Sequence, residues 1–359
     1  MDLLPPLRNL RRKPRFDVLT LFVTNRCNAR CATCFYWREL NAPIDNLTLE
    51  EYRTIATSMP PFEKLLLSGG EPTLEPNLPD LVDLFLTRPE QALVLPTNGL
   101  QTALVLERTR EILRRRPQNR LVVGVSLDGL ETTHDQIRGV PGAYRKALGT
   151  LHELARLREE YPLLQVTTLT TVMEQNENEI LALLETLHTL GQADYYTVEP
   201  LRNVHPSAEL NPPHLEALHR IQDRCNVLSF ETLQKRHAHD APLMLSHIRA
   251  LQREQRHVLQ GKRLRFPCLA GSVVGVLEPN GDVRLCELLD PIGNIRDFDC
   301  DFNRIWNCAK AQEQRRYIAS LDCSCTHCVN LGQSLPFSLF PELLRAWDQS
   351  RIEKTGKIS

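Results

Sequence analysis

Apolar runs alternate with amphipathic segments over the first two hundred residues. Short apolar runs are typical of buried strands, and longer segments with apolar residues three or four positions apart are typical of helices. Strands are expected over residues 18–24, 64–68, 92–97, 121–127, 163–172 and 195–199. Helices are expected over residues 48–59, 78–87, 101–115, 143–160 and 178–190. Thr48 and Glu51 form the S/T-x-x-E pattern that begins a helix, and Gly191 is the residue type that ends one.

This alternation predicts an α/β fold. Steady strand–helix units favour a parallel sheet with helices outside it. The pattern does not choose between an open doubly wound sheet and a partial barrel, but both bind ligands at the carboxyl ends of the strands. Distinctive motifs follow four strands in turn: a group of cysteines, Gly-Gly-Glu, Thr-Asn-Gly and Ser-Leu-Asp-Gly.

The pattern changes after about residue 203. We expect a loop over 206–213, a polar helical bridge over 214–262, a hairpin over 273–286 that turns at Asn280-Gly281, a helix containing Trp306, and a tail helix over 341–351. A cysteine-rich stretch over 323–328 precedes that tail.

Composition limits the possible functions. The 359-residue chain has a net charge of −1, which gives no broad attraction to nucleic acid or anionic membrane. The basic runs 11–15 and 114–116 are expected to be solvated. The N-terminus has the wrong order for a signal peptide, and no apolar stretch approaches the roughly 20 residues that span a bilayer. We therefore expect a cytoplasmic protein, in which the 11 cysteines are metal ligands or catalytic groups more often than disulfides.

Three of these cysteines form a C-x3-C-x2-C triplet after the first strand: Cys27, Cys31 and Cys34. Thiolates are soft ligands that favour iron–sulfur clusters, zinc and Cu(I). Three thiolates can hold three irons of a cubane cluster and leave the fourth open to a small molecule. A structural zinc site needs a fourth nearby Cys or His, and this loop has none.

The triplet, with the strand-end motifs, resembles the radical S-adenosylmethionine (SAM) superfamily. The resemblance implies that SAM chelates the open iron of a 4Fe–4S cluster and is cleaved reductively to a 5′-deoxyadenosyl radical, which abstracts hydrogen from a substrate. Thr33 stands where the family often has an aromatic residue before the third cysteine, and Phe35, Tyr36 and Trp37 follow it instead.

The same resemblance implies SAM contacts at the strand ends. Gly-Gly-Glu matches the family's motif for the SAM amino group, and polar residues after the fourth strand match contacts to its ribose or carboxylate. The predicted contacts are Gly69, Gly70, Glu71, Thr97, Asn98, Ser126 and Asp128. The stretch 134–139 resembles the H-D-x-I-R-G loop of members with an auxiliary domain, in which Arg138 either meets a carboxylate or pins the loop.

The later cysteines resemble the SPASM and Twitch auxiliary domains. The spacing of the first two fits the opening of the SPASM pattern, and the shorter ending resembles Twitch, which holds one auxiliary 4Fe–4S cluster. The predicted ligands are Cys268, Cys286, Cys325 and Cys328, with Cys323 as a competitor for one place. Spacing alone would equally fit a four-cysteine zinc site. The remaining Cys225, Cys300 and Cys308 are expected to be small buried hydrophobes.

Histidine, tyrosine and glutamate residues outside the cysteine groups are further candidates. The pair His237 and His239 is expected to be solvated, and Tyr195 and Tyr196 are expected in the core or a lid. Glu199, at the end of the sixth strand, is a candidate substrate contact or proton acceptor.

The sequence thus predicts a partial (β/α)6 TIM-type barrel with a smaller C-terminal Cys-rich SPASM/Twitch-like domain. The expected divisions are an arm over 1–14, the core barrel over 15–203, a bridge over 204–262, the auxiliary domain over 263–335 and a tail over 336–359. The expected activity is modification of a sugar-like or natural-product small molecule, or of a peptide or protein side chain. The expected partners are that substrate and a reductant such as flavodoxin or ferredoxin. A non-catalytic iron–sulfur carrier, a zinc-stabilised scaffold and an RNA-modifying enzyme are the alternatives.

Overall fold

One sheet organises the computed structural model, which describes residues 14–237, 241–320 and 322–338. Its strand order is β6-β5-β4-β3-β2-β1-β7-β8-β9, and β1 to β6 run parallel in chain order. These six strands are β1 Val18–Thr24, β2 Lys64–Gly69, β3 Ala92–Thr97, β4 Arg120–Ser126, β5 Leu164–Val172 and β6 Tyr195–Pro200. Each lies within a residue of its predicted position at either end, and the sheet is open among the described residues. The predicted partial barrel is confirmed.

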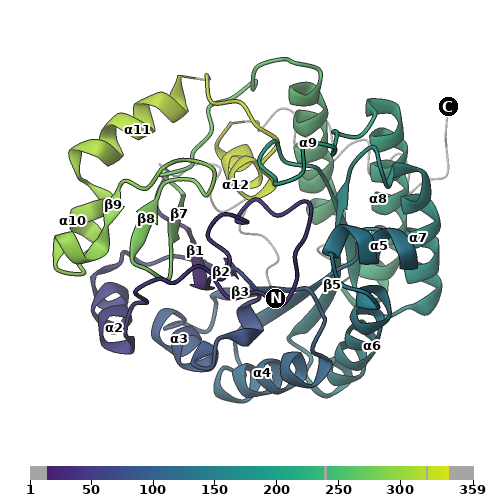
Figure 1. Ribbon diagram of the computed structural model, residues 1–359, viewed down its shortest axis with the longest axis horizontal. Coiled ribbons are helices and arrows are strands. Elements are labelled where there is room, and N and C mark those ends of the chain that lie inside the picture. Colours follow the sequence, from purple (N-terminus) through teal and green to yellow (C-terminus); the bar gives the residue numbers. More distant parts are fainter. Residues whose placement is uncertain (1–13, 238–240, 321, 339–359) are drawn as a thin grey trace.

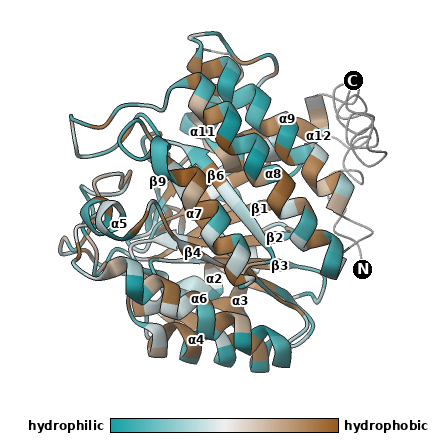
Figure 2. Cartoon of the chain, turned by 90° about the vertical axis from the view of Figure 1, so that its right-hand side faces the viewer, coloured by the Kyte–Doolittle hydropathy of each residue, from teal (hydrophilic) through white to brown (hydrophobic). Residues whose placement is uncertain are grey.

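Helices cover the outer side of this sheet, as Figure 1 shows. They are α2 Leu49–Ser58, α3 Leu78–Phe85, α4 Thr102–Arg115, α6 Ala143–Glu160 and α7 Glu177–Leu190. Figure 2 shows hydrophilic residues interleaved with hydrophobic ones along α4, α6 and α8 (Leu215–His237). This mixture is typical of helices that bury one face and expose the other.

A further helix, α5 (Glu131–Arg138), corrects the prediction of a loop at the H-D-x-I-R-G stretch. Only His134 and Ile137 of this helix are buried, so it has no apolar periodicity for the sequence to show. The helix ends at Gly139, whose φ of 64° is the left-handed conformation that favours glycine.

The C-terminal hairpin joins the barrel sheet. Strands β7 (Val274–Leu277) and β8 (Asp282–Arg284) turn through Gly281 as predicted, and β9 (Gly293–Asn294) follows them. Strand β7 pairs in parallel with β1, which the sequence did not predict. Gly275 permits this arrangement, since a Cβ there would lie 2.6 Å from the Trp306 ring and 2.9 Å from Phe16.

Helices complete the second half of the chain. The predicted bridge consists of α8 and α9 (Ala241–Leu259). The helix expected around Trp306 is divided into two helices, α10 (Phe302–Trp306) and α11 (Ala309–Ala319). The last helix within the described residues, α12 (Cys328–Ser338), lies near the middle of the view in Figure 1. Two short 3-10 helices, η1 (Pro72–Leu74) and η2 (Ile295–Phe298), complete the description. No helix among the described residues is long and apolar enough to cross a membrane. Residues 1–13 of the predicted arm over 1–14 lie outside the described residues, as do His239 and the predicted tail helix over 341–351.

Candidate functional site

The three cysteines of the triplet share one half-buried loop after β1. Burial raises the pKa of Cys27 to about 11 and that of Cys34 to about 12. Negative charge on Cys31 raises both values further, and charge on Cys27 also opposes the ionisation of Cys34. The three thiols are therefore close enough to act on one another electrostatically, as ligands of one centre must be.

Two asparagines fix the path of this loop, and the sequence analysis missed both. Asn41 accepts a hydrogen bond from the Cys27 N–H at 3.0 Å, and its Nδ2 donates to the Cys27 carbonyl at 3.2 Å. Asn25 donates through Nδ2 to the carbonyls of Glu39 and Ala42 at 2.9 and 2.7 Å. The φ of Asn41 is 58°, a left-handed conformation that asparagine tolerates better than most residues. The residue type of Asn41 was therefore the available signal in the sequence.

The glycine pair after β2 packs directly against the start of the cysteine loop. A Cβ on Gly69 would lie 2.3 Å from the Thr24 carbonyl oxygen, and one on Gly70 would lie 2.1 Å from the Arg26 carbonyl oxygen. Both contacts are with backbone, which cannot move aside cheaply. The two glycines are thus required for the close approach of β2 to the chain entering Cys27.

Glu71 connects the ends of β2 and β3. Its Oε1 accepts hydrogen bonds from the hydroxyls of Thr73 and Thr97 at 2.7 and 2.9 Å, and its Oε2 accepts the Asn98 N–H at 2.7 Å. Burial raises the pKa of this carboxyl, while the hydrogen bonds oppose that rise. Asn98 in turn donates through Nδ2 to Asn28, inside the cysteine loop, at 2.8 Å. Glu71, Thr97 and Asn98 therefore lie together beside the triplet.

Asp128, after β4, is fully buried and engaged by the protein. Its Oδ1 accepts the Thr171 N–H at 2.8 Å, and its Oδ2 lies 2.6 Å from Arg138 Nη2. The Asp128 N–H donates to His134 Nδ1 at 3.0 Å. Ser126 ends β4 half-buried on the same strand. A contact from either residue to SAM stays a prediction; in this structure Asp128 orients Arg138.

Apolar side chains border the third cysteine. Tyr36 and Phe35 pack on Phe22 of β1 with ring centroids 4.9 and 6.2 Å apart, and Val276 of β7 completes the group. Cys34 lies against this cluster. The aromatic residues after Cys34 thus shield one side of the loop from water.

The C-terminal cysteines form a second group. Cys268 and Cys286 are buried, and Cys323, Cys325 and Cys328 are half-buried. Burial raises the pKa of Cys268 to about 12, and charge on Cys325 and Cys323 adds to that rise. Charge on Cys325 and Cys268 acts in the same way on Cys286, which also accepts a hydrogen bond from Asn330 at 3.1 Å. The cysteine-rich stretch over 323–328 and the end of the hairpin at Cys286 are therefore adjacent in space.

Arg202 lies between the two cysteine groups. Its guanidinium stacks over the Phe35 ring at 4.6 Å, and its Nη1 lies 3.3 Å from Glu287 Oε1. Its positive charge also acts on the Cys328 thiol, whose pKa it lowers against the larger effect of burial. Glu199 of β6 is nearby, bonded to Gln255, and burial raises its pKa to about 7. Arg202 could not be predicted from the sequence, because its partners are far away along the chain.

The donor sets can be compared with what a cofactor needs. No three His, Cys, Asp or Glu side chains among the described residues have the arrangement that one metal ion requires. A cubane cluster presents separate iron corners, so its ligands are spaced more widely than those of one ion. Three soft thiols beside a buried arginine fit such a cluster at the first site, and the later cysteines offer the four thiols of a second.

Some predicted residues lie elsewhere. Tyr196 is buried with its ring against His188, and Cys225 is buried as predicted, with its thiol donating to the Tyr196 carbonyl. Cys300 and Cys308 are half-buried, which corrects the prediction that they are buried. Cys308 instead caps α11, since its Sγ accepts the Ala311 N–H at 3.4 Å.

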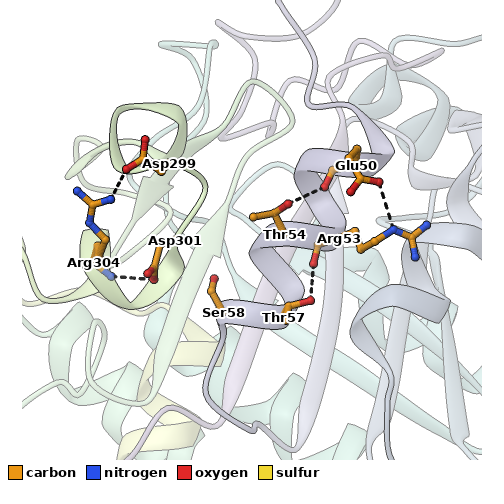
Figure 3. A pocket seen from close by; sticks show the side chains of 8 residues that line it. All are labelled: Glu50, Arg53, Thr54, Thr57, Ser58, Asp299, Asp301 and Arg304. Atoms are coloured by element: carbon orange, nitrogen blue, oxygen red, sulfur yellow. Dashed lines mark hydrogen bonds and ion pairs between the residues drawn. The ribbon is translucent and has the colours of Figure 1, made fainter.

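A surface groove lies apart from these cysteines, between α2 and the turn that leads into α10 (Figure 3). Its side chains bond mainly within their own elements. Thr54 and Thr57 donate to carbonyls one turn earlier in α2, and Arg304 pairs with Asp299. Nothing in this groove converges on a ligand, so the strand ends remain the candidate site.

Comparison with known proteins identifies the first half of the chain. Residues 21–187 match the sequence model of the Radical SAM superfamily. Among curated relatives, an AdoMet-dependent heme synthase of Methanosarcina barkeri is 27% identical over 318 residues, 85% of this chain and 86% of the relative. A Fe-coproporphyrin III synthase from the same organism is 33% identical, but the match spans 49% of this chain and only 42% of that protein.

The solved structures agree in fold. The peptide-bound SuiB of Streptococcus suis superposes with a TM-score of 0.59 at 14% identity, covering 86% of this chain and 69% of SuiB. At this identity the similarity concerns the fold alone.

Proposed function

Because residues 21–187 of the chain are a radical SAM domain, we propose that this enzyme cleaves SAM reductively at a 4Fe–4S cluster held by Cys27, Cys31 and Cys34. The observation that carries the proposal is the convergence of three thiols on one loop, framed by Glu71, Asn98 and Arg138. The cluster, when bound, supplies the single electron that releases a 5′-deoxyadenosyl radical from SAM, and this radical removes hydrogen from the substrate.

The protein's own residues prepare the site. Gly69 and Gly70 allow β2 to approach the cysteine loop, and Glu71 holds the end of β3 beside it. Phe22, Phe35 and Tyr36 exclude water on one side of the loop. Water exclusion matters because a carbon radical must reach its substrate before it meets other hydrogen donors.

The proposal includes a second, auxiliary cluster on Cys268, Cys286, Cys325 and Cys328, with Cys323 as the alternative to one of them. Its support is that charge on Cys268 and Cys325 acts on the pKa of Cys286, and that Asn330 donates a hydrogen bond to the Cys286 sulfur. The charge of Arg202 acts on the fourth thiol, Cys328. An auxiliary cluster would accept an electron from the substrate radical or anchor the substrate. A flavodoxin or ferredoxin would serve as the reductant.

For the substrate we favour a carboxylate-bearing small molecule, and tetrapyrroles first. The heme synthase relative aligns with 85% of this chain, and the second relative is named for another tetrapyrrole. Arg202 lies between the cysteine groups, where it could meet a substrate carboxylate. A peptide is the second class to test, because the fold is shared with SuiB bound to its precursor peptide.

The experiment is anaerobic reconstitution with iron and sulfide, then dithionite and SAM, with 5′-deoxyadenosine as the readout. Wild type is expected to form 5′-deoxyadenosine, Cys27→Ala to form none, and the control Cys308→Ser, which keeps a helix cap, to match wild type. About eight irons per chain would support two clusters, and about four would count against the auxiliary one.

Other outcomes separate the alternatives. Iron without 5′-deoxyadenosine would favour the electron carrier, and zinc in both sites would favour the scaffold. Stimulation of 5′-deoxyadenosine formation by Fe-coproporphyrin III, with a changed mass of that compound, would support the substrate class. Stimulation by a peptide alone would replace it.

A further inference from the structure

The end of α5 is fixed to the cysteine loop on both sides of Cys31. The Arg30 N–H donates to the Arg138 carbonyl at 3.0 Å, and the Ala32 N–H donates to the Ile137 carbonyl at 2.8 Å. Gly139 completes the contact, because a Cβ there would lie 2.7 Å from the Arg30 carbonyl oxygen. These backbone contacts therefore fix the distance between the backbones of Cys31 and Arg138.

The Arg138 side chain is directed at Cys31. Its Nη1 lies 3.7 Å from Cys31 Sγ, within the range of a hydrogen bond to sulfur, and its side chain is only 13% exposed. Its Nη2 lies 2.6 Å from Asp128 Oδ2. A guanidinium has a planar, rigid fork of donors, so one arginine can meet both partners at once.

Asp128 cannot follow the arginine if it moves. Its carboxylate accepts the Thr171 N–H, its own N–H donates to His134, and Asn176 Nδ2 donates to its carbonyl at 2.6 Å. Two of these bonds hold the Asp128 backbone and the third holds its carboxylate, which in turn pairs with Arg138.

Charge explains why this matters. The guanidinium of Arg138 carries a positive charge 3.7 Å from the Cys31 sulfur, and its side chain is mostly buried, so solvent screens that charge little. A cluster becomes more negative when it accepts an electron. Hydrogen bonds to the ligand sulfurs and nearby positive charge favour that reduced form.

We propose that Arg138, oriented by Asp128, is a positioning residue that donates a hydrogen bond to the Cys31 sulfur and raises the reduction potential of the cluster. The proposal rests on the proposed function. The reduction adds one electron from an external low-potential donor and breaks no bond. The effect of Arg138 is therefore on how fully a given donor reduces the cluster.

The test is an EPR-monitored redox titration of reconstituted protein that carries Cys268→Ala and Cys286→Ala, which removes the second cluster's signal. Arg138→Gln is expected to lower the ratio of reduced to oxidised cluster about tenfold at fixed potential, a shift of about 59 mV to more negative values. Arg138→Lys should shift the potential in the same direction, because lysine cannot meet both partners. The shift should be smaller than in Arg138→Gln, because lysine keeps the positive charge. Arg158→Gln is the matched control. Arg158 is also mostly buried and lies 2.9 Å from Asp194 at the other end of the barrel, so this variant should leave the potential unchanged.

Each outcome has a distinct meaning. A wild-type potential in either Arg138 variant that loads iron fully overturns the inference and leaves the proposed function intact. Failure of both variants to load iron would give Arg138 a structural role in assembly and would also reject the tuning role. Failure of the unsubstituted parent to bind a SAM-responsive cluster would instead reject the proposed function.

Discussion

Gly70 lies where the chain enters the cysteine triplet, with no space for a side chain. A methyl group there would lie 2.1 Å from the Arg26 carbonyl oxygen, one residue before Cys27. We predict that Gly70→Ala displaces the loop and loses most of the iron bound at the first site, measured by iron content and visible absorbance. Gly149→Ala is the control, since its Cβ in α6 would meet nothing within 4 Å. It should keep its iron and gain about 0.5–1 kcal/mol of stability. Equal iron in both variants would contradict the role of Gly70.

His134 gives a pH prediction. Burial, aided by the charge of Arg138, lowers its pKa to about 4, so the folded protein keeps this side chain neutral. The unfolded chain protonates it near pH 6.5. Its contribution to stability is therefore complete above about pH 6.5 and is lost as the pH falls toward 4. In urea unfolding of the apoprotein, His134→Asn should be less stable than wild type at pH 7 and lose less stability between pH 7 and 5.

The exposed His219 on α8 provides the matched control for that experiment. His219→Gln should follow the wild-type pH profile. Parallel profiles for wild type and His134→Asn would show that protonation of His134 does not set the pH dependence of stability, which would contradict this account.

At this scale the sequence predicted the residues whose chemistry is written in short motifs. The cysteines, Gly69-Gly70-Glu71 and the strand-end polar residues could be found because each motif is local. Arg138 was named from its motif, but its partner Cys31 is 107 residues away and was not predicted. Arg202 was missed because its partner Glu287 is also distant along the chain. A single sequence does not show which distant residues meet.

Among the elements, α2 illustrates what local sequence can specify. Thr48 accepts the Glu51 N–H at 3.2 Å, and Glu51 Oε2 accepts the Thr48 N–H at 2.7 Å, which confirms the predicted capping box. Glu51 also pairs with Arg296 at 2.5 Å, so this cap attaches α2 to the C-terminal region.

We predict that Thr48→Ala lowers the free energy of unfolding by about 1 kcal/mol, measured by urea denaturation of the apoprotein. The loss arises because the N–H of Glu51 no longer has its side-chain acceptor. Thr57→Ala is the control on the same helix, where the exposed hydroxyl bonds only to its own helix at Arg53 and a change within about 0.5 kcal/mol is expected. A larger loss for Thr57→Ala than for Thr48→Ala would contradict the capping account.

Strand β7 illustrates what local sequence cannot specify. Its residues and the turn at Gly281 were predicted, because apolar runs on either side of an Asn-Gly pair are a local signal for a hairpin. Its pairing with β1 joins residues more than 250 positions apart, and that pairing depends on the absence of a side chain at Gly275. Helix α5 was missed for a related reason, since it is held by contacts to the cysteine loop and not by an apolar stripe.

Across the whole molecule, the barrel and the C-terminal region share one structure. Phe16, just before β1, packs on Phe302 and Trp306 with ring centroids 5.3 and 5.2 Å away, and β7 extends the barrel sheet. We predict that the apoprotein unfolds in a single transition, with far-UV circular dichroism and the fluorescence of Trp306 changing together in a Trp37→Phe, Trp347→Phe background. Two separated transitions would show that the C-terminal region is an independent unit.

The central claim is that the loop after β1 holds a cluster with one iron open to SAM. The most direct measurement is the EPR spectrum of the reduced Cys268→Ala, Cys286→Ala protein with and without SAM. The account predicts about four irons per chain and a spectrum that changes when SAM is added, because SAM binds the iron that lacks a protein ligand. A cluster spectrum that SAM leaves unchanged, or a protein that binds no cluster at this loop, would contradict it.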